Sequence, residues 1–134
     1  MSNENLVLVY GSLKRGYYNH DVIAFDFENR SRNKGYDYLG DTKTVDKFTM
    51  YDLGSFPAIS FDENGKQVKG ELYAVDDATF NLIDILEGYP DHYNRIEVNL
   101  ENTDVRAWIY FYENPEDHLA VVESPNDTEY VWEQ

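Results

Sequence analysis

The sequence predicts an α+β fold in which a small mixed or antiparallel sheet curls into a barrel-like shape, with one main helix packed beside it. Many short segments are apolar or alternate between apolar and polar residues, and one stretch alone shows clear helical spacing. The 134 residues include no cysteine, so the core must form without disulfides. We expect a single domain over residues 1–134, with a core at about 6–112 and an acidic tail at 113–134.

The first expected strand is the continuous apolar run at residues 6–10, which is typical of a strand buried on both faces. It leads into a loop at residues 11–16 that begins and ends with glycine. Residues 20–27 could form a short helix, and residues 29–35 resemble a polar loop.

Strands are expected next at residues 38–45 and 48–53, where β-branched and aromatic residues accumulate. A further apolar segment at residues 56–61 precedes the dipeptide Asn64-Gly65, which is typical of a hairpin turn. Residues 68–75 are therefore expected to be the return strand of a hairpin.

The main helix is expected to begin after Asp76 or Asp77, because aspartate is a favoured N-cap residue. Gly88 provides a C-terminal stop, and Pro90 follows it, so the helix should end at Glu87-Gly88. Its expected buried stripe consists of Phe80, Ile83, Leu86 and, one step off, Leu82.

Two alternating segments after the helix, residues 93–100 and 105–112, predict strands joined by a turn at 102–104. In the acidic tail, only residues 130–132 look able to dock onto the domain. Because Tyr93 and Arg95 are two residues apart, a strand would place both on one face, where they could order a carboxylate or a loop. A structural pair between Arg95 and an acidic residue is the simpler interpretation in such an acidic chain.

The formal net charge is -15, from 26 acidic and 11 basic residues. Such a charge repels nucleic acids and anionic membranes, so neither is an expected partner. It favours neutral or cationic partners, although solubility alone is the simpler explanation. The polar amino terminus and the short first apolar run predict neither a signal peptide nor a membrane span, so a cytoplasmic protein is expected.

The loop Tyr10-Gly11-Ser12-Leu13-Lys14 follows a buried strand, and glycine lets the backbone turn sharply there. Successive main-chain N–H groups in such a turn can form an anion-binding nest, suited to a substrate carboxylate or a developing oxyanion. An ordinary turn after a strand is the alternative interpretation. A Walker A motif is excluded, because Tyr17 stands where that motif requires lysine.

Glu87 ends the predicted helix, where the negative end of the helix dipole disfavours a carboxylate. If its surroundings are also apolar, both effects raise its pKa, which suits a group that accepts and returns a proton near neutral pH. The alternative is an exposed glutamate on a frayed helix end. Asp84, one turn earlier, is expected to face solvent and receives no role.

Other catalytic chemistries find little support in the sequence, and no metal or cofactor is predicted. The absence of cysteine excludes thiol catalysis and zinc-thiolate sites. The three histidines, His20, His92 and His118, lack metal-ligand spacing, and His118 next to Asp117 resembles a surface pair. None of the three serines considered as nucleophiles has the Gly-x-Ser-x-Gly context: Ser12, Ser55 and Ser60.

Several motifs occur together in a characteristic order. The opening Leu8-Val-Tyr-Gly-Ser-Leu-Lys-Arg-Gly16, followed by Asn19-His20, resembles the signature of the gamma-glutamylcyclotransferase-like family, most closely its gamma-glutamylamine cyclotransferase branch. The later segments that resemble this family are Tyr51-Asp-Leu-Gly54 with Phe56-Pro-Ala58, Gly70-Glu-Leu-Tyr73, Leu86-Glu-Gly-Tyr-Pro90 and Tyr93-x-Arg95. Each match alone is weak, whereas the ordered set, from Leu6 to about Tyr112, is specific.

The resemblance implies a barrel-like α+β fold with the glycine loop at one mouth. It implies that Glu87 is the general acid/base of a cyclotransferase, which converts small γ-glutamyl amines or amides to 5-oxoproline and free amine by attack of the substrate's own α-amine. Main-chain N–H groups of Gly11, Ser12 and Leu13 would bind the glutamyl moiety. Tyr10 would line the pocket, and Tyr93 is expected to contact the substrate.

Three features depart from the family pattern. Phe56 replaces a more common tyrosine, the segment 24–36 is unusual, and the acidic tail is peculiar to this chain. The acidic surface would suit a cationic amine, as in γ-glutamyl-lysine. A non-catalytic domain that binds a small carboxylate is the main alternative, and a charge-based interaction protein is a third. None of these interpretations specifies an oligomeric state.

Overall fold

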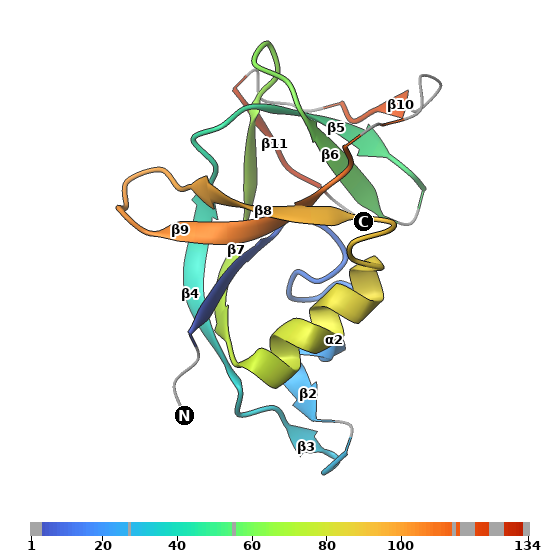
Figure 1. Ribbon diagram of the computed structural model, residues 1–134, viewed down its shortest axis with the longest axis vertical. Helices are drawn as coiled ribbons and strands as arrows, with labels where there is room; N and C mark the ends of the chain where they lie inside the picture. Colours follow the sequence, from blue (N-terminus) through green and yellow to red (C-terminus); the bar gives the residue numbers. More distant parts are fainter. Residues whose placement is uncertain are drawn as a thin grey trace.

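The computed structural model describes residues 4–26, 28–54, 56–113, 115, 120–123 and 128–132, and it confirms the predicted α+β class (Figure 1). Within the described residues, neither helix is long and apolar enough to cross a membrane. The elements are β1 (Asn5–Val9), α1 (Asp21–Ala24), β2 (Phe25–Asp26), β3 (Ser31–Arg32), β4 (Tyr36–Lys43), β5 (Phe48–Asp52), β6 (Pro57–Phe61), β7 (Gln67–Val75), α2 (Asp77–Glu87), β8 (Asn94–Asn99), β9 (Arg106–Phe111), β10 (Ala120–Val121) and β11 (Glu129–Tyr130).

The main sheet is mixed, with strand order β11-β7-β1-β9-β8, and β4 pairs with β7 as well. β1 lies inside this sheet, antiparallel to β7 and parallel to β9. Its side chains alternate between two buried clusters: Val7 and Val9 pack with Phe80 and Ile83 of α2, whereas Leu8 belongs to the cluster on the other face. Burial on both faces explains why the first strand is an uninterrupted apolar run.

A second sheet, with order β10-β5-β6, closes over the face of the main sheet away from α2 (Figure 1). The N–H of Tyr112 donates to the Ile59 carbonyl over 2.8 Å and so ties the end of β9 to β6. Phe48 and Met50 of this sheet share one buried cluster with Leu8 of the main sheet. The two sheets therefore curl around a common core, as the predicted barrel-like arrangement requires.

The predicted hairpin around Asn64-Gly65 is wrong, although a turn does form there. β6 pairs with β5, and β7 pairs with β1, β4 and β11 instead. Neither Asn64 nor Gly65 has the positive φ that a type I′ hairpin turn requires. Gly65 is needed for another reason: a Cβ there would lie 2.1 Å from the Phe48 carbonyl oxygen, against which the chain passes into β7.

The helix α2 confirms both predicted ends. The Asp76 side chain accepts a 2.8 Å hydrogen bond from the Thr79 N–H, and Gly88 caps the C-terminus at a φ of 68°, in the left-handed region. The predicted stripe is only partly buried, because Leu82 and Leu86 are 46% and 39% exposed. The helix contacts the sheet along a narrow face, through residues such as Phe80 and Ile83.

The predicted short helix within residues 20–27 is confirmed as α1, which packs near α2. The expected loop at 29–35 instead includes β3, which pairs with β2 in a small antiparallel ribbon. Docking of residues 130–132 is confirmed: Tyr130 and Trp132 are buried, and β11 runs parallel to β7. The tail contributes a second docked piece that was not predicted, because β10 pairs with β5.

Candidate active site

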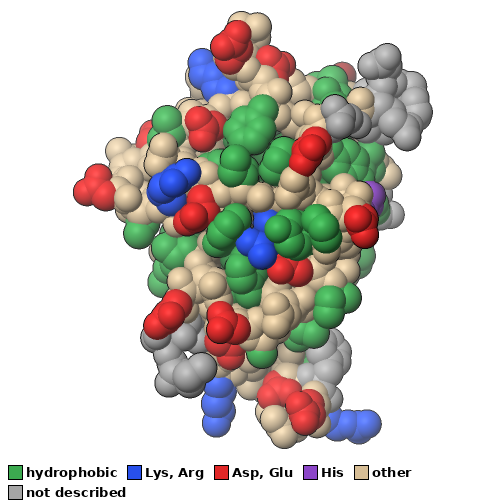
Figure 2. Space-filling model, in the orientation of Figure 1, with side chains coloured by type: hydrophobic (Ala, Val, Ile, Leu, Met, Phe, Trp, Pro, Cys, Tyr) green, Lys and Arg blue, Asp and Glu red, His purple; other side chains and the backbone are tan. Residues whose placement is uncertain are grey.

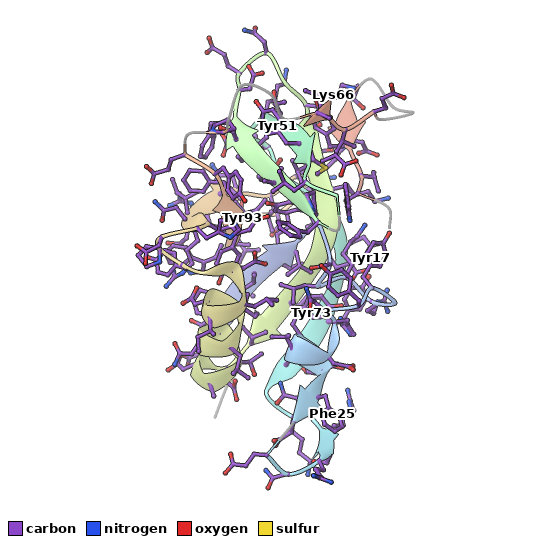
Figure 3. The ribbon with its side chains drawn as sticks, turned by 90° about the vertical axis from the view of Figure 1, so that its right-hand side faces the viewer. Tyr17, Phe25, Tyr51, Lys66, Tyr73 and Tyr93 are labelled. Carbon is purple, nitrogen blue, oxygen red and sulfur yellow. The ribbon has the colours of Figure 1, made fainter. Side chains whose placement is uncertain are left out.

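A cavity of about 350 Å³ lies between the end of β1, the loop that follows it and the C-terminal end of α2. Figure 3 shows Tyr93 just beyond the end of this helix. The structure brings together all six residues that the sequence singled out, because each of them lines this cavity: Tyr10, Gly11, Ser12, Leu13, Glu87 and Tyr93.

The loop after β1 turns tightly at its start, where the Lys14 N–H donates to the Gly11 carbonyl over 3.1 Å. A Cβ at Gly11 would lie 2.7 Å from the Pro57 ring, so glycine is required by the close approach of β6. Among the described residues, none accepts a hydrogen bond from the main-chain N–H of Ser12 or Leu13. Two donors at the wall of the cavity are therefore available to an anion.

The predicted Asn19-His20 pair fastens this loop from one side. The Asn19 N–H donates to the Ser12 carbonyl over 3.0 Å, and its side-chain amide donates to Ser12 Oγ over 2.9 Å. The Nδ1 atom of His20 lies 2.8 Å from the Leu13 carbonyl oxygen. These contacts hold the carbonyl oxygens of Ser12 and Leu13, which leaves the amides of the same residues for the cavity.

The far end of the loop is fixed by two anchors. The Arg15 N–H donates to Glu71 Oε1 of β7 over 2.8 Å. The Lys14 side chain is buried, and its ammonium group donates to the main-chain carbonyl of Trp132 and lies 4.6 Å from the centre of the Tyr17 ring. The docked C-terminal segment therefore supports the loop that contributes to the cavity.

Glu87 is the last residue of α2, and its side chain lines the cavity. Burial disfavours the ionised carboxylate and raises the pKa of Glu87 from 4.5 to about 7. Among the described residues, none donates a hydrogen bond to this carboxyl group, so nothing offsets the cost of burying its charge. At neutral pH the group can both accept and release a proton.

Three tyrosines surround this carboxyl group, and burial raises the pKa of each one. The negative charge of Glu87 raises these values further. The hydroxyl of Tyr10 donates to the Tyr110 carbonyl over 2.7 Å, and that of Tyr93 donates to the Pro57 carbonyl over 2.6 Å. Tyr110 was not predicted for the site, although the alternating segment 105–112 that contains it was predicted as a strand.

Asp84 does not face solvent as predicted, because two partners hold its carboxylate. Arg95 donates to Asp84 Oδ1 over 2.9 Å, which confirms the predicted structural pair, and the Tyr110 hydroxyl donates to the same atom over 2.5 Å. The Arg95 guanidinium also lies 4.3 to 4.5 Å from the ring centres of three aromatic residues. These rings are Phe80, Tyr89 and Trp108. Figure 2 shows one face of the molecule, on which basic side chains lie among apolar ones.

The other residues considered in the sequence differ in their relation to the cavity. His92 lines the cavity, with Nε2 2.7 Å from the Tyr112 hydroxyl. Ser60 is not among the cavity residues, while Ser55 and His118 lie outside the described residues. In the described part of the chain, no three acidic or histidine side chains gather in a way that could hold a metal ion.

The chain matches known proteins along most of its length. The family model described as gamma-glutamyl cyclotransferase, AIG2-like, matches residues 7–133. A Methanocaldococcus jannaschii protein, named as a candidate gamma-glutamylcyclotransferase, is 35% identical over 127 residues, which cover 92% of this chain and 96% of the relative. The gamma-glutamylaminecyclotransferase C of Danio rerio is 33% identical over 99 residues, covering 71% of this chain and 61% of that protein.

Solved structures agree on the fold. The crystal structure of a mouse AIG2-like protein aligns with a TM-score of 0.75 over 97% of both chains, at 24% sequence identity. The family match and the curated relatives together identify the class of enzyme. The chain belongs to the AIG2-like gamma-glutamyl cyclotransferase family and is a cyclotransferase enzyme.

Proposed function

We propose that this enzyme converts γ-glutamyl amines or amides to 5-oxoproline and a free amine, with Glu87 as the group that moves protons. One observation carries the proposal. A carboxyl group without a described partner, whose pKa is raised to about 7, shares a cavity with two main-chain N–H donors that are open to an anion.

The chemistry needs no nucleophile from the protein. Glu87, as a carboxylate, accepts a proton from the substrate's α-ammonium group, and the freed amine attacks the γ-carbonyl carbon. A carbon–nitrogen bond forms and closes a five-membered ring. Glu87 then gives its proton to the departing amine as the original amide bond breaks. The ring nitrogen loses a second proton to the Glu87 carboxylate, which leaves the amide N–H of 5-oxoproline, and Glu87 releases this proton to the freed amine or to solvent. One carboxyl group thus serves as base and then as acid.

In this proposal the loop after β1 binds the substrate. The N–H groups of Ser12 and Leu13 would hold the substrate's α-carboxylate, while Tyr10 and Tyr93 form walls beside the ring that closes. General acid–base help of this kind contributes roughly 10²–10⁴-fold to the rate. Holding amine and carbonyl in contact adds a further, larger factor through proximity. The name of the Danio rerio relative, gamma-glutamylaminecyclotransferase C, supports an amine as the leaving group.

The test is release of 5-oxoproline from a panel of γ-glutamyl amides by the wild type and by Glu87→Gln. The amide keeps the size of the side chain but cannot accept the proton, so turnover should fall at least 100-fold. Glu97→Gln is the matched control, because Glu97 is exposed on β8 and does not line the cavity. Full turnover by Glu87→Gln, or none by the wild type on any amide, would refute the proposal.

A further inference from the structure

The opening of the cavity is lined by aromatic and apolar side chains. Among the residues that line it, Tyr18 is 55% exposed and Leu86 is 39% exposed, so both stand at the opening. Phe56 and His92 complete this rim, and their rings meet edge to face with centres 6.5 Å apart. A molecule that extends from the interior to solvent therefore passes between apolar and aromatic surfaces.

Charge is almost absent from this route. Among the described residues that line the cavity, Glu87 is the only one with a carboxylate, and no lysine or arginine is present. The proposed reaction commits Glu87 to the transferred proton. The neighbouring Asp84 does not line the cavity, and its carboxylate is held by Arg95 and Tyr110. The Nε2 atom of His92 lies 2.7 Å from the Tyr112 hydroxyl, so this nitrogen already has a partner.

Asn19 also lines the cavity. Its side-chain amide donates to Ser12 Oγ over 2.9 Å, which ties it to the loop after β1. An ammonium group on the leaving amine would therefore give up water at the rim without gaining a counter-charge from the described residues, which is unfavourable. An alkyl or aryl group would bury apolar surface against Tyr18, Phe56 and Leu86, which is favourable.

We propose that the amine half of the substrate is uncharged and apolar, so that the enzyme acts on γ-glutamyl amides of alkyl or aryl amines. This inference rests on the proposed function and specifies its substrate class. It replaces the expectation of a cationic amine, which rested on the net charge of -15. That charge belongs to the surface as a whole, whereas the residues at the rim carry little of it.

The experiment compares three γ-glutamyl amides with leaving amines of one length: pentylamine, which is apolar, 1,5-diaminopentane, which is cationic, and 5-aminopentanoate, which is anionic. We expect kcat/KM for 5-oxoproline release to be at least tenfold higher for the pentylamide, a size of effect usual for apolar pockets. Equal values, or a preference for either charged amide, would overturn the inference while leaving the proposed function intact.

A substitution at the rim tests the same inference by changing the protein instead of the substrate. Leu86→Glu places a carboxylate on the rim, so the kcat/KM ratio of the diaminopentane amide to the pentylamide should rise about tenfold. Ile85→Glu is the matched control: it adds the same charge one residue away, at a position that is 75% exposed and does not line the cavity. An equal change in both variants would show that general charge, and not the rim, sets the preference.

A third readout separates the two proposals. If the wild type converts none of the three amides and no other γ-glutamyl amide of the panel, the proposed function is wrong. Calorimetric binding of the same amides still tests the rim: at least tenfold tighter binding of the pentylamide supports the apolar subsite, and equal or weaker binding refutes it.

Discussion

Two acidic residues of α2, Asp84 and Glu87, lie one turn apart, but their carboxyl groups have different surroundings. The carboxylate of Asp84 is held by Arg95 and by the hydroxyl of Tyr110, whereas the carboxyl group of Glu87 accepts no hydrogen bond from any described residue. Both lie in the last turn, where the helix dipole disfavours a negative charge. The difference teaches that partners, and not position on the helix, decide whether a carboxylate is fixed within the structure or stays available for the proposed proton transfer.

The largest expected effect separates the two acids by activity. Glu87→Gln should lower kcat for 5-oxoproline release at least 100-fold, because the proton acceptor is lost. Asp84→Asn should lower the activity of the folded protein less than tenfold, since Asp84 does not line the cavity. Steady-state kinetics at a temperature where both variants are folded, verified by circular dichroism, measures this. Similar losses in both variants would remove the distinction.

Stability should separate them in the opposite direction. Asp84→Asn leaves the Arg95 guanidinium without a charged partner, and the side chains of this pair are only 16% and 17% exposed. We expect the free energy of unfolding at pH 7 to fall by about 2 kcal/mol, below the range for fully buried pairs because some exposure remains. Urea denaturation measures the change, with Glu97→Gln as a control. A change below about 0.5 kcal/mol would mean that the pair contributes little.

The pH dependence sharpens the comparison further. The pKa of Glu87 is about 7 in the folded protein and ordinarily 4.5, so the folded state binds the proton more tightly. The contribution of Glu87 to the free energy of unfolding is therefore fully present below pH 4.5 and is lost as the pH rises through about 7. Relative to Glu87→Gln, the wild type should lose about 1–2 kcal/mol between pH 5 and pH 8, a value reduced because the cavity is open to water.

Urea denaturation of both proteins at the two pH values checks this, and parallel curves would show that the carboxyl group is solvated. The activity should change with pH in the direction opposite to the stability. Because Glu87 must be ionised to accept the first proton, kcat/KM should rise with pH through an inflection near 7. An inflection near the ordinary value of 4.5 would contradict the raised pKa.

The smallest expected effect concerns Tyr110, which connects the cavity to Asp84. Tyr110 lines the cavity and donates its hydroxyl to Asp84 over 2.5 Å. Tyr110→Phe keeps the ring and removes this hydrogen bond to a charged group, so the free energy of unfolding should fall by about 1–2 kcal/mol, and by less in the Asp84→Asn background. A double-mutant cycle measures the coupling, and additive losses would show that the two groups act independently.

Local signals in the sequence predicted one half of this comparison and missed the other. Glu87 could be found because the N-cap Asp76, the apolar spacing and Gly88 together define where the helix ends. These local signals place it at the end of a helix, whereas its position in one site with the glycine loop was expected from the family resemblance. Asp84 looked exposed because its partners lie 11 and 26 residues away, and such pairings depend on how the strands stack.

The errors in the predicted fold have the same origin. Asn64-Gly65 is a local hairpin signal, but the strand that follows finds better partners in β1 and β4 than in β6. Leu86 fits the apolar spacing of α2, yet it is exposed because it lies beyond the face that covers the sheet, at the mouth of the cavity. Local patterns determine which elements form, whereas competition among strands determines which surfaces remain uncovered.

The contact between Lys14 and the Trp132 carbonyl links opposite ends of the chain at the loop that faces the cavity. Trp132 also accepts a 3.1 Å hydrogen bond from the Tyr17 hydroxyl, so its removal would release two side chains at once. A protein shortened to end at Tyr130 would retain Glu87 and its surroundings. Its defect should therefore be a raised KM at a nearly normal kcat, and such a truncation would report on how firmly the substrate is gripped.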